Sequence, residues 1–322
     1  MKVLLTGAFG NVGLSTLDEL IKKDYQVKVF EVKNSRNQRI SQGYKKKAEI
    51  FWGDIRNIED VKKAVYGSDV VIHTAAIIPP LADQKPKLAE SVNFYGTANI
   101  ISAMKNEKKP GKLIYTSSIA VYGDRLKNPM IYSEDSPNPN SHDEYARQKL
   151  ECEKMIRESG LEYTIFRLTY IVSMNKLKMD PLMFDMPLET SIEICDTKDV
   201  GLALSNAVEN NEILGKTLNI AGGEKCRTSY REYLDRMTEL FGLGKGFLPK
   251  DAFGKDSFHC GYMETAESEK FLKYQRHTLA DYFNEVKKKV AASRFFMRMF
   301  KPTIRQYLLK RSKYYCAKPA RA

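Results

Sequence analysis

The sequence of 322 residues has few cysteines, few histidines and no long hydrophobic run. Its five cysteines are odd in number, lie far apart and form no C-x-x-C, which argues against a disulfide framework or a zinc site. The four histidines are scattered too, so we expect no metal. No run approaches the ~18 apolar residues of a membrane span, and the apolar start of the chain ends too early for a signal peptide. These absences favour a cytoplasmic protein with reduced thiols.

The excess positive charge is confined to one end of the chain. The sequence carries 52 Lys and Arg against 40 Asp and Glu, a formal net charge of +12. Residues 286–322 hold 12 of the basic residues and no acidic one, which leaves residues 1–285 formally neutral. Such an asymmetry indicates a tail that meets an anionic partner rather than a basic enzyme.

Strand-like and helical patterns alternate through the first half of the chain. Several of the apolar runs are apolar on both faces, as in a parallel sheet that helices cover on each side. The alternation predicts an α/β fold with a Rossmann-type, doubly wound parallel sheet. We expect strands at 2–6, 26–32, 50–52, 69–73, 112–117 and 163–168, and helices at 11–23, 58–66, 86–106 and 145–159.

The second half is less regular and predicts a smaller C-terminal substrate lobe. Residues 174–187, rich in Met, indicate an irregular segment that faces the substrate. A strand end entering a helix is expected at 196–208, with Asp199 as its N-cap. Further helices are expected at 228–241 and 279–289. The predicted domains are a dinucleotide-binding domain at 1–168, a lobe at 169–285 with part of 190–208 returning to the core, and a basic amphipathic tail at 286–322.

A glycine-rich turn follows the first expected strand and opens the first expected helix. Its glycines let the backbone turn tightly and approach a pyrophosphate, and the helix N-terminus adds free N–H groups and a positive dipole end. The alternative is a turn that serves helix–strand packing alone. The candidate cofactor contacts here are Gly7, Phe9, Gly10, Asn11, Val12 and Gly13.

An acidic residue, Glu31, ends the second expected strand, 18 residues after Gly13. A carboxylate there can accept hydrogen bonds from both hydroxyls of an adenine ribose and would repel the 2′-phosphate of NADP. NAD is therefore the expected cofactor. Lys33, Arg36 and Arg39 lie just beyond and keep NADP as the alternative.

Tyr145 and Lys149 are four residues apart, one turn along an expected helix. We expect the Lys149 ammonium to lower the pKa of Tyr145 and so to tune it for proton exchange with a substrate hydroxyl or carbonyl. The pair follows residues 117–123, where a serine hydroxyl at a strand end could hold the substrate oxygen. Taken alone, such a pair is also typical of a solvated helix face.

With these motifs in place, the chain resembles an extended short-chain dehydrogenase/reductase of the NAD-dependent epimerase/dehydratase type. The pieces occur in family order over about residues 2–285. They are TGAFGNVG at 6–13, GDI at 53–55, HTAA at 73–76, SSIAVYG at 117–123, YARQK at 145–149 and NIAGG at 219–223.

The resemblance implies roles for single residues. Tyr145 would be the general acid/base, and Lys149 would tune it and bind the nicotinamide ribose. Ser118, three residues before the Val of VYG, would be the family hydroxyl in place of Ser117. Asn93 would support the active site from the preceding helix. Further cofactor contacts would come from Asp54 and Ile55, both at adenine, and from Ala75 and Ala76.

Two departures from the family pattern concern the substrate. Sugar-nucleotide enzymes of the family usually carry Asn where this chain has Tyr170, and residues 167–199 form a short segment here. Hydroxysteroid- and aryl-carbonyl-type reductases lack that Asn as well. The methionines around 179–186 would suit an apolar ligand or would pack in the lobe core.

The resulting hypothesis is NAD-dependent hydride transfer at a substrate carbinol or ketone, as in an epimerase/dehydratase-type oxidoreductase. The first alternative is a hydroxysteroid- or aryl-carbonyl-type dehydrogenase/reductase with a small-molecule substrate. The second is a non-catalytic NAD-binding scaffold, against which the intact set of Ser118, Tyr145 and Lys149 argues.

Apolar and basic residues alternate in the tail, and Pro302 should split any helix there. A basic amphipathic segment with aromatic residues suits an anionic membrane surface, so residues 290–322 could hold the protein peripherally at a membrane. Equally, the apolar face could pack on the enzyme or on a second subunit of a homodimer. Nucleic acid ranks last, because no nucleic-acid-binding fold accompanies the charge.

Overall fold

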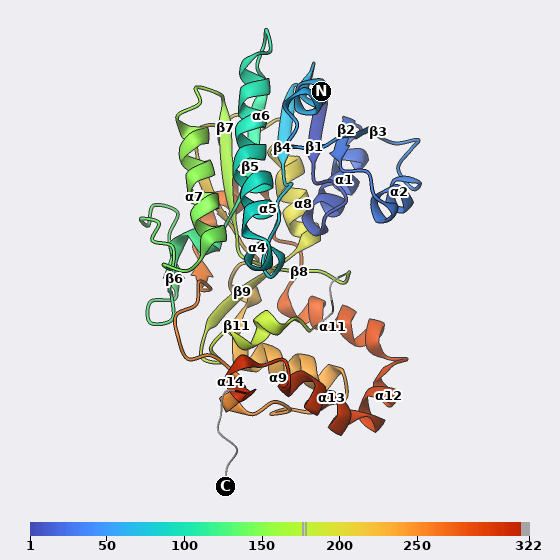
Figure 1. Cartoon of the computed structure of the whole chain (residues 1–322), viewed down its shortest axis with the longest axis vertical. Coiled ribbons are helices and arrows are strands. Elements are labelled where there is room, and N and C mark those ends of the chain that lie inside the picture. Colours follow the sequence, from blue (N-terminus) through green and yellow to red (C-terminus); the bar gives the residue numbers. More distant parts are fainter. Residues whose placement is uncertain (176, 178, 317–322) are drawn as a thin grey trace.

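A seven-stranded, wholly parallel sheet forms one part of the molecule and a smaller lobe lies beneath it (Figure 1). The computed structural model describes residues 1–175, 177 and 179–316. The strand order β10-β7-β5-β4-β1-β2-β3 is that of a Rossmann-type sheet, as predicted. The strands are β1 Lys2–Thr6, β2 Gln26–Glu31, β3 Glu49–Trp52, β4 Val70–His73, β5 Lys112–Ser118, β7 Tyr163–Leu168 and β10 Thr217–Ile220.

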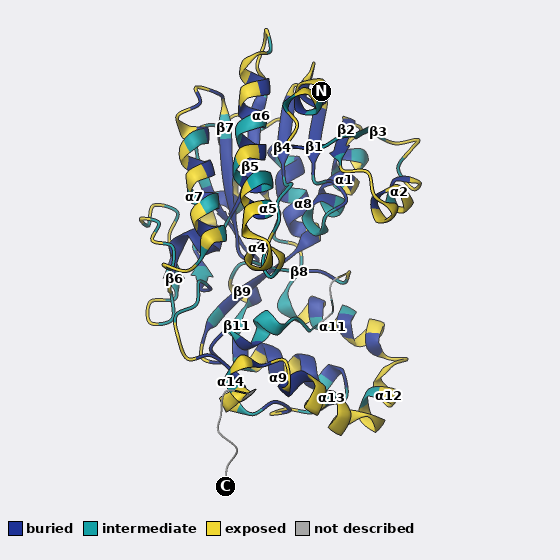
Figure 2. Ribbon diagram, in the orientation of Figure 1, coloured by how far each residue is buried: buried dark blue, intermediate teal, exposed yellow. Residues whose placement is uncertain are grey.

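Alternate residues of the central strands serve two separate cores. In β1, Val3 and Leu5 join one buried cluster whereas Leu4 joins another, because successive side chains point to opposite faces of a sheet. Helices α1 (Asn11–Lys22) and α8 (Thr197–Asn206) pack together on one face. The opposite face is covered by α3 (Ile58–Val65), α6 (Gly96–Lys105) and α7 (Glu144–Arg157). The central strands β1, β4, β5 and β7 are buried along most of their length (Figure 2).

Three local features differ from the sequence-based prediction. The helix expected at 86–106 is interrupted, because a π-helical segment at Ser91–Tyr95 separates α5 (Pro86–Glu90) from α6. The short helix α2 (Ser35–Ser41) was not predicted; its N-cap Asn34 accepts from the amide of Asn37. Asp199 is not the N-cap of α8: Asp196, in extended conformation at the end of β9 (Ser191–Asp196), caps that helix.

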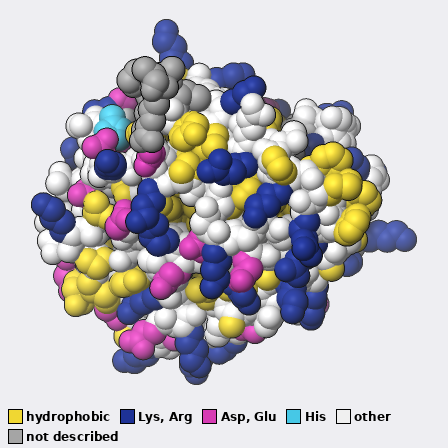
Figure 3. Space-filling model, turned by 90° about the horizontal axis from the view of Figure 1, so that it is seen from below, with side chains coloured by type: hydrophobic (Ala, Val, Ile, Leu, Met, Phe, Trp, Pro, Cys, Tyr) yellow, Lys and Arg dark blue, Asp and Glu magenta, His cyan; other side chains and the backbone are white. Residues whose placement is uncertain are grey.

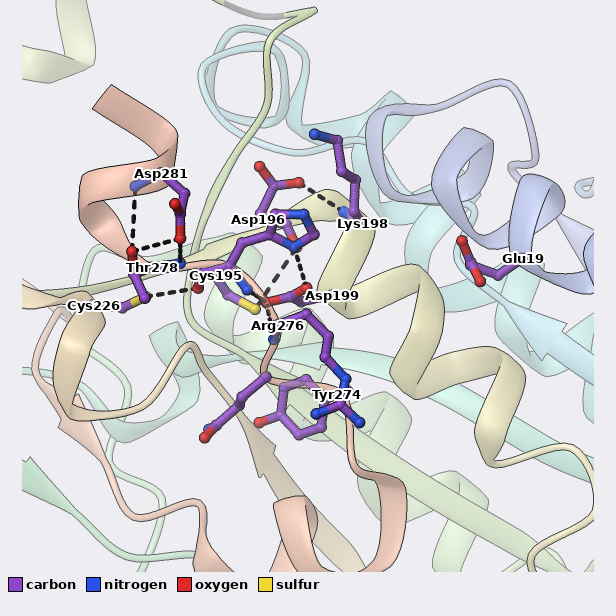
Figure 4. A network of polar contacts seen from close by, with 12 residues as sticks. Glu19, Cys195, Asp196, Lys198, Asp199, Cys226, Tyr274, Arg276, Thr278 and Asp281 are labelled. Carbon is purple, nitrogen blue, oxygen red and sulfur yellow. Dashed lines mark hydrogen bonds and ion pairs between the residues drawn. The ribbon is translucent and has the colours of Figure 1, made fainter. Parts of the chain in front are cut away.

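Asp199 instead ties the lobe to α8 (Figure 4). Its Oδ2 accepts from the backbone amides of Arg276 and His277, each at 3.0 Å, and its Oδ1 lies 2.6 Å from Nδ1 of His277. Lys198, one position before it, forms an ion pair with Glu285 at 2.7 Å. The start of α8 is thereby fixed to the connection that leads into the C-terminal helices.

The lobe is built around a second sheet and several helices. Its three-stranded sheet has the order β11-β9-β8, and β12 pairs separately with β6. A cluster of buried residues joins this sheet to α9 and α11. The lobe elements are β6 Met130–Ile131, β8 Tyr170–Val172, β11 Arg227–Ser229, β12 Tyr262–Met263, α9 Tyr230–Leu240 and α11 Leu279–Val290. Helix α10 (Ala266–Leu272) packs instead on α8 and β10 of the large sheet.

The C-terminal helices continue the lobe without a linker. The expected boundary at residue 285 falls inside α11, and α12 (Arg294–Met299), α13 (Lys301–Leu309) and α14 (Lys313–Cys316) follow. The helix is interrupted between α12 and α13, next to Pro302, as predicted. Among the described residues, no helix is long and apolar enough to cross a membrane.

Candidate active site

The turn between β1 and α1 leaves no room for side chains at two of its glycines. Gly7 has φ +69°, which favours glycine, and a Cβ there would lie 2.7 Å from the Cα of Ala75. A Cβ at Gly13 would collide with the carbonyl oxygen of Gly7. Gly10 occupies the N-cap of α1, and no side chain caps the helix. The first amides of α1 therefore face a backbone cradle suited to an anion.

Glu31 connects this turn to α2. Its Oε1 accepts from the amide of Phe9 at 2.7 Å, and its Oε2 accepts from Nδ2 of Asn37 at 3.1 Å. Burial raises the pKa of Glu31, although the amides of Phe9 and Val32 and the charge of Arg36 oppose the shift. The Phe9 side chain is buried in the core, so Phe9 contributes to this turn through its backbone amide and not through its ring. Sequence reasoning missed Asn37, which lies on the unpredicted helix α2.

The two residues expected at adenine have partners within the protein. Asp54 binds the guanidinium of Arg56, with Nη2–Oδ2 at 2.5 Å, and that hydrogen bond lowers the pKa of Asp54. Ile55 is buried against Gly96 of α6. Across the turn, the amide of Ala75 donates to Oγ1 of Thr6 at 3.2 Å, which holds the start of the Ala75–Ala76 segment beside Gly7.

Tyr145, Lys149 and Ser118 converge at the carboxyl end of β5. Asp143 caps α7, so Tyr145 lies in the first turn of the helix and Lys149 one turn later. Lys149 is buried, and its Nζ donates to the carbonyl of Thr116 at 2.7 Å. Ser118 ends β5; its hydroxyl accepts from the amide of Ala120 at 3.2 Å and lies close enough to the Tyr145 phenol to act on its pKa.

Burial controls the protonation of both helix residues. It lowers the pKa of Lys149 to about 8, against the attraction of Cys152 and Glu153. It raises the pKa of Tyr145, and the hydrogen bond from Ser118 offsets only part of that rise. The prediction that Lys149 lowers the pKa of Tyr145 is wrong for this structure. The ammonium is directed at the Thr116 carbonyl and lies 5.9 Å from the centre of the Tyr145 ring.

A third residue on the same face of α7 anchors the helix. Glu153 is wholly buried and lies two turns after Tyr145. It accepts from Ser117 Oγ at 2.6 Å, from Arg167 Nη2 at 2.7 Å and from Arg157 Nη2 at 2.7 Å. Burial acts against its ionised form, but these donors hold the pKa of Glu153 below its usual value. The Ser117 hydroxyl is thus used for anchoring, whereas the Ser118 hydroxyl faces Tyr145.

Asn93 lies behind the site rather than in it. Its Oδ1 accepts from the amide of Ile77 at 2.8 Å, and its Nδ2 donates to the carbonyl of Ile77 and to Oε1 of Gln148, each at 2.9 Å. The π-helical segment places this side chain so that it joins the loop after β4 to α7. Gln148, next to Lys149 in sequence, was missed by sequence reasoning.

His73, the first residue of HTAA, is structural. It bridges Thr6 Oγ1 at 2.7 Å and Thr97 Oγ1 at 3.0 Å, and burial lowers its pKa to about 3. The ring is therefore neutral at physiological pH. Within the described residues, no group of three or more His, Cys, Asp or Glu is arranged to hold a metal ion.

The methionine-rich segment that follows β8 packs largely on the lobe. Phe184 and Met186 are buried in its core, and Met174, Met179 and Met183 are partly buried against it. The Tyr170 ring contacts that of Tyr233 edge-on, with 6.1 Å between centroids. Lys176 and Lys178, in the same segment, lie outside the described residues.

Comparison with known proteins gives three findings on family. The model of the 3-beta hydroxysteroid dehydrogenase/isomerase family matches residues 4–162. Mouse 3 beta-hydroxysteroid dehydrogenase type 7 is 29% identical over 163 residues, which cover 49% of this chain and 44% of the mouse protein. An N-acetyl-alpha-D-glucosaminyl-diphospho-ditrans,octacis-undecaprenol 4-epimerase of Escherichia coli O157:H7 is 36% identical over 159 residues, covering 48% and 43%. The matches thus span less than half the length of these curated relatives.

Solved structures resemble the chain over nearly its whole length. A UDP-glucose 4-epimerase from Thermotoga maritima has a TM-score of 0.72 at 19% identity and covers 91% of this chain and 99% of its own. A Bacillus cereus UDP-glucuronic acid 4-epimerase, in complex with UDP-glucuronic acid and NAD, has a TM-score of 0.73 at 20% identity with the same coverage. At these identities the likeness is one of fold.

The motifs of the first half, the family model over residues 4–162 and the strand order of the sheet agree with one another. Over residues 4–162 the chain is similar to the 3-beta hydroxysteroid dehydrogenase/isomerase family, and its fold is that of extended short-chain dehydrogenases/reductases of the NAD-dependent epimerase/dehydratase type.

Proposed function

We propose that this protein is an NAD-dependent oxidoreductase that transfers hydride at a secondary carbinol or the corresponding ketone. The observation that carries the proposal is the convergence of Ser118, Tyr145 and Lys149 at the carboxyl end of β5. In open α/β sheets, ligands bind outside the carboxyl ends of the strands, where the strand order reverses. That point lies here between β1 and β4, at the glycine turn.

The turn fits the pyrophosphate of a dinucleotide. A Cβ at Gly7 or Gly13 would collide with the backbone of Ala75 or of Gly7, so only glycine allows this tight turn, and the N-terminus of α1 carries no side-chain cap. The amides of this turn would hold the pyrophosphate and Glu31 the adenine ribose. When bound, NAD supplies the hydride acceptor. Crystal structures of fold neighbours contain NAD, which supports this choice.

Tyr145 would exchange the proton at the substrate oxygen. Because burial raises its pKa, the phenol is protonated at neutral pH and can donate to a ketone oxygen. In the oxidative direction Tyr145 first gives up its own proton, and the phenolate then accepts the hydroxyl proton of the carbinol as hydride leaves the carbinol carbon. Ser118 would hold the same oxygen by a hydrogen bond, and Lys149 would bind the nicotinamide ribose, the role that the family resemblance implies for it.

For the substrate we infer an alcohol of apolar or lipid-linked character rather than a common UDP- or dTDP-sugar. Tyr170 stands where sugar-nucleotide enzymes usually have Asn, and partly buried methionines lie in the adjoining segment. The names of the two curated relatives refer to a hydroxysteroid and to a sugar carried on undecaprenol. The family model favours a hydroxysteroid-type dehydrogenase as the second candidate.

A substrate panel tests this proposal. The purified protein with NAD is offered an undecaprenyl-diphosphate sugar, a 3β-hydroxysteroid, UDP-glucose and UDP-glucuronate, and both NADH formation and epimerised product are measured. Turnover of one of the first two is expected. Clean conversion of a UDP-sugar would contradict the proposed substrate class but would still support hydride transfer as the reaction. NAD binding without turnover of any alcohol would favour the scaffold alternative.

A further inference from the structure

The apolar residues of the C-terminal helices divide between two sides. Val290, Leu308 and Leu309 are buried in the core of the lobe. Ser312, wholly buried, donates to the carbonyl of Ala252 at 2.6 Å, and Arg305 Nε donates to the carbonyl of Phe247 at 2.9 Å. One side of α11–α14 is therefore packed on the enzyme, as one of the sequence-based alternatives expected.

The other side carries large apolar residues in water. On α12 and at its C-cap Phe300, the exposed fractions are 71% for Phe295, 58% for Phe296, 56% for Met299 and 52% for Phe300. At spacings of one, four and five residues, these four share one face of the helix. We call them the α12 face. Tyr307 on α13 adds a fourth exposed ring, at 59%.

Basic residues accompany the α12 face. Arg294 and Arg298 lie on the same helix, with their stems against the turn at Gly242, and Lys301 begins α13. Residues 286–322 contain no Asp or Glu. Figure 3 looks onto this end of the molecule and shows hydrophobic side chains at its right-hand edge with Lys and Arg beside them. A contiguous apolar patch of this kind on a soluble fold marks an interaction surface.

We propose that the α12 face binds the surface of an anionic phospholipid bilayer. Its three phenylalanines and Met299 enter the interfacial layer, and Arg294, Arg298 and Lys301 pair with lipid phosphates. A second copy of the chain fits less well. In a two-fold contact through this face, the same three cations would lie opposite one another with no acidic residue of the segment to neutralise them.

The proposed surface is connected to the substrate lobe. Helix α11 leads directly into α12, and Lys289 at its end donates to the carbonyl of Met174 at 2.6 Å. Met174 begins the segment that follows β8 and packs on the lobe. Docking would thus hold this segment near the bilayer, which suits an apolar substrate, but docking itself does not rest on the proposed function.

Vesicle flotation of the full chain tests the proposal. Wild type should float with phosphatidylcholine vesicles that contain phosphatidylserine, and much less with phosphatidylcholine alone or at high salt. Phe295→Ser with Phe296→Ser should lower the partition coefficient about tenfold or more, because two exposed rings no longer enter the interface. The matched control is Tyr66→Ser with Tyr132→Ser, which removes two exposed rings elsewhere and should change nothing.

A second pair of variants isolates the charge. Arg294→Gln, Arg298→Gln and Lys301→Gln together should weaken binding to the anionic vesicles. Lys45→Gln, Lys46→Gln and Lys47→Gln remove the same charge from the loop before β3 and should not. All variants keep the buried Leu308 and Leu309, and thermal unfolding checks that each is folded.

Equal flotation of wild type and the Phe295/Phe296 variant would overturn the proposal. A second outcome would overturn it too. If wild type sediments as a dimer, and the same variant is a monomer with unchanged flotation, then the α12 face binds a second copy of the chain and not a bilayer. Binding of an oligonucleotide, but not of vesicles, that depends on the three cations would overturn it as well.

Discussion

Burial sets the proton affinity of the two titratable residues at the proposed catalytic centre. Lys149 keeps one short hydrogen bond, to the carbonyl of Thr116, and has little exposure to water. Its neutral form is therefore favoured relative to a lysine in water, and the pKa falls to about 8. Tyr145 is shifted in the direction that keeps its proton. Both residues are neutral or nearly so over part of the alkaline range.

The lowered pKa of Lys149 predicts a rise in stability with pH. Between about 8 in the folded chain and the ordinary value of 10.5, the unfolded chain binds more protons. The free energy of unfolding should therefore increase over this range, by at most about 3 kcal/mol. Below pH 8 the folded chain bears the full cost of a buried ammonium. Lys149→Met should abolish the rise.

Denaturant unfolding at several pH values measures this effect, with the exposed Lys154→Met on the same helix as control. The free energy of unfolding of wild type should rise relative to that of Lys149→Met between pH 7 and pH 10. A difference that stays constant across this range would contradict the lowered pKa.

The contacts of Glu31 predict a preference for NAD over NADP. A carboxylate fixed by the Phe9 amide and by Asn37 would repel a 2′-phosphate on the adenine ribose. Calorimetric titration should give NAD about tenfold tighter binding or more. Glu31→Gln, which keeps a hydrogen-bonding oxygen, should narrow the gap. Tighter binding of NADP to wild type would mean that Lys33, Arg36 or Arg39 governs the site.

At the scale of elements, the Rossmann sheet was predictable and its interruptions were not. Alternation of apolar strands and amphipathic helices located every strand from β1 to β7 except the two-residue β6. Local pattern cannot show that a helix passes through a π-helical turn at Ser91–Tyr95, because the side chains stay helix-like in spacing. Nor can it show that Asp196 rather than Asp199 caps α8, since both are good capping residues.

The part of the candidate site that sequence motifs predicted is the part at the end of β5 and the start of α7. Ser118, Tyr145 and Lys149 lie together because β5 and α7 are neighbours, which the family order implied. Asn37, Gln148 and Glu153 were missed because their partners come from other elements. Nothing local in the sequence marks Glu153 as buried, since a Glu on a helix is ordinarily solvated.

Glu153 predicts the cost of releasing α7 from the sheet. Removing its carboxylate leaves Arg167 buried without a charge partner, which should cost about 3–5 kcal/mol of unfolding free energy. Glu153→Gln tests this by denaturant unfolding, and Glu151→Gln, exposed on the same helix, is the matched control. A loss no larger than that of the control would show that α7 is held by its other contacts.

At the scale of the whole molecule, the basic C-terminal segment is part of the wall of the lobe. The sequence pattern identified its apolar stripe but not which residues face the enzyme, because that depends on how α12–α14 fold back over α9 and its neighbours (Figure 1). The outcome is a lobe whose inner side is buried and whose outer side is apolar and basic.

This division predicts a large loss of stability at one residue and almost none at its neighbour. Leu308→Ala should cost about 2–5 kcal/mol, because the side chain is buried in the lobe core. Tyr307→Ala, one position earlier and 59% exposed, should change stability by no more than about 0.5 kcal/mol. Thermal unfolding of the two variants is the measurement. Similar losses in both would mean that the helices do not sit on the lobe as described.

Hydride transfer with Tyr145 as proton carrier is the central claim, and Tyr145→Phe tests it most directly. The substitution removes the phenolic proton and leaves the glycine turn and Glu31 in place. With the substrate found in the panel, kcat should fall about 10²–10⁴-fold, while the Kd for NAD measured by calorimetry stays nearly unchanged. Wild-type kcat in the Tyr145→Phe protein would contradict the account.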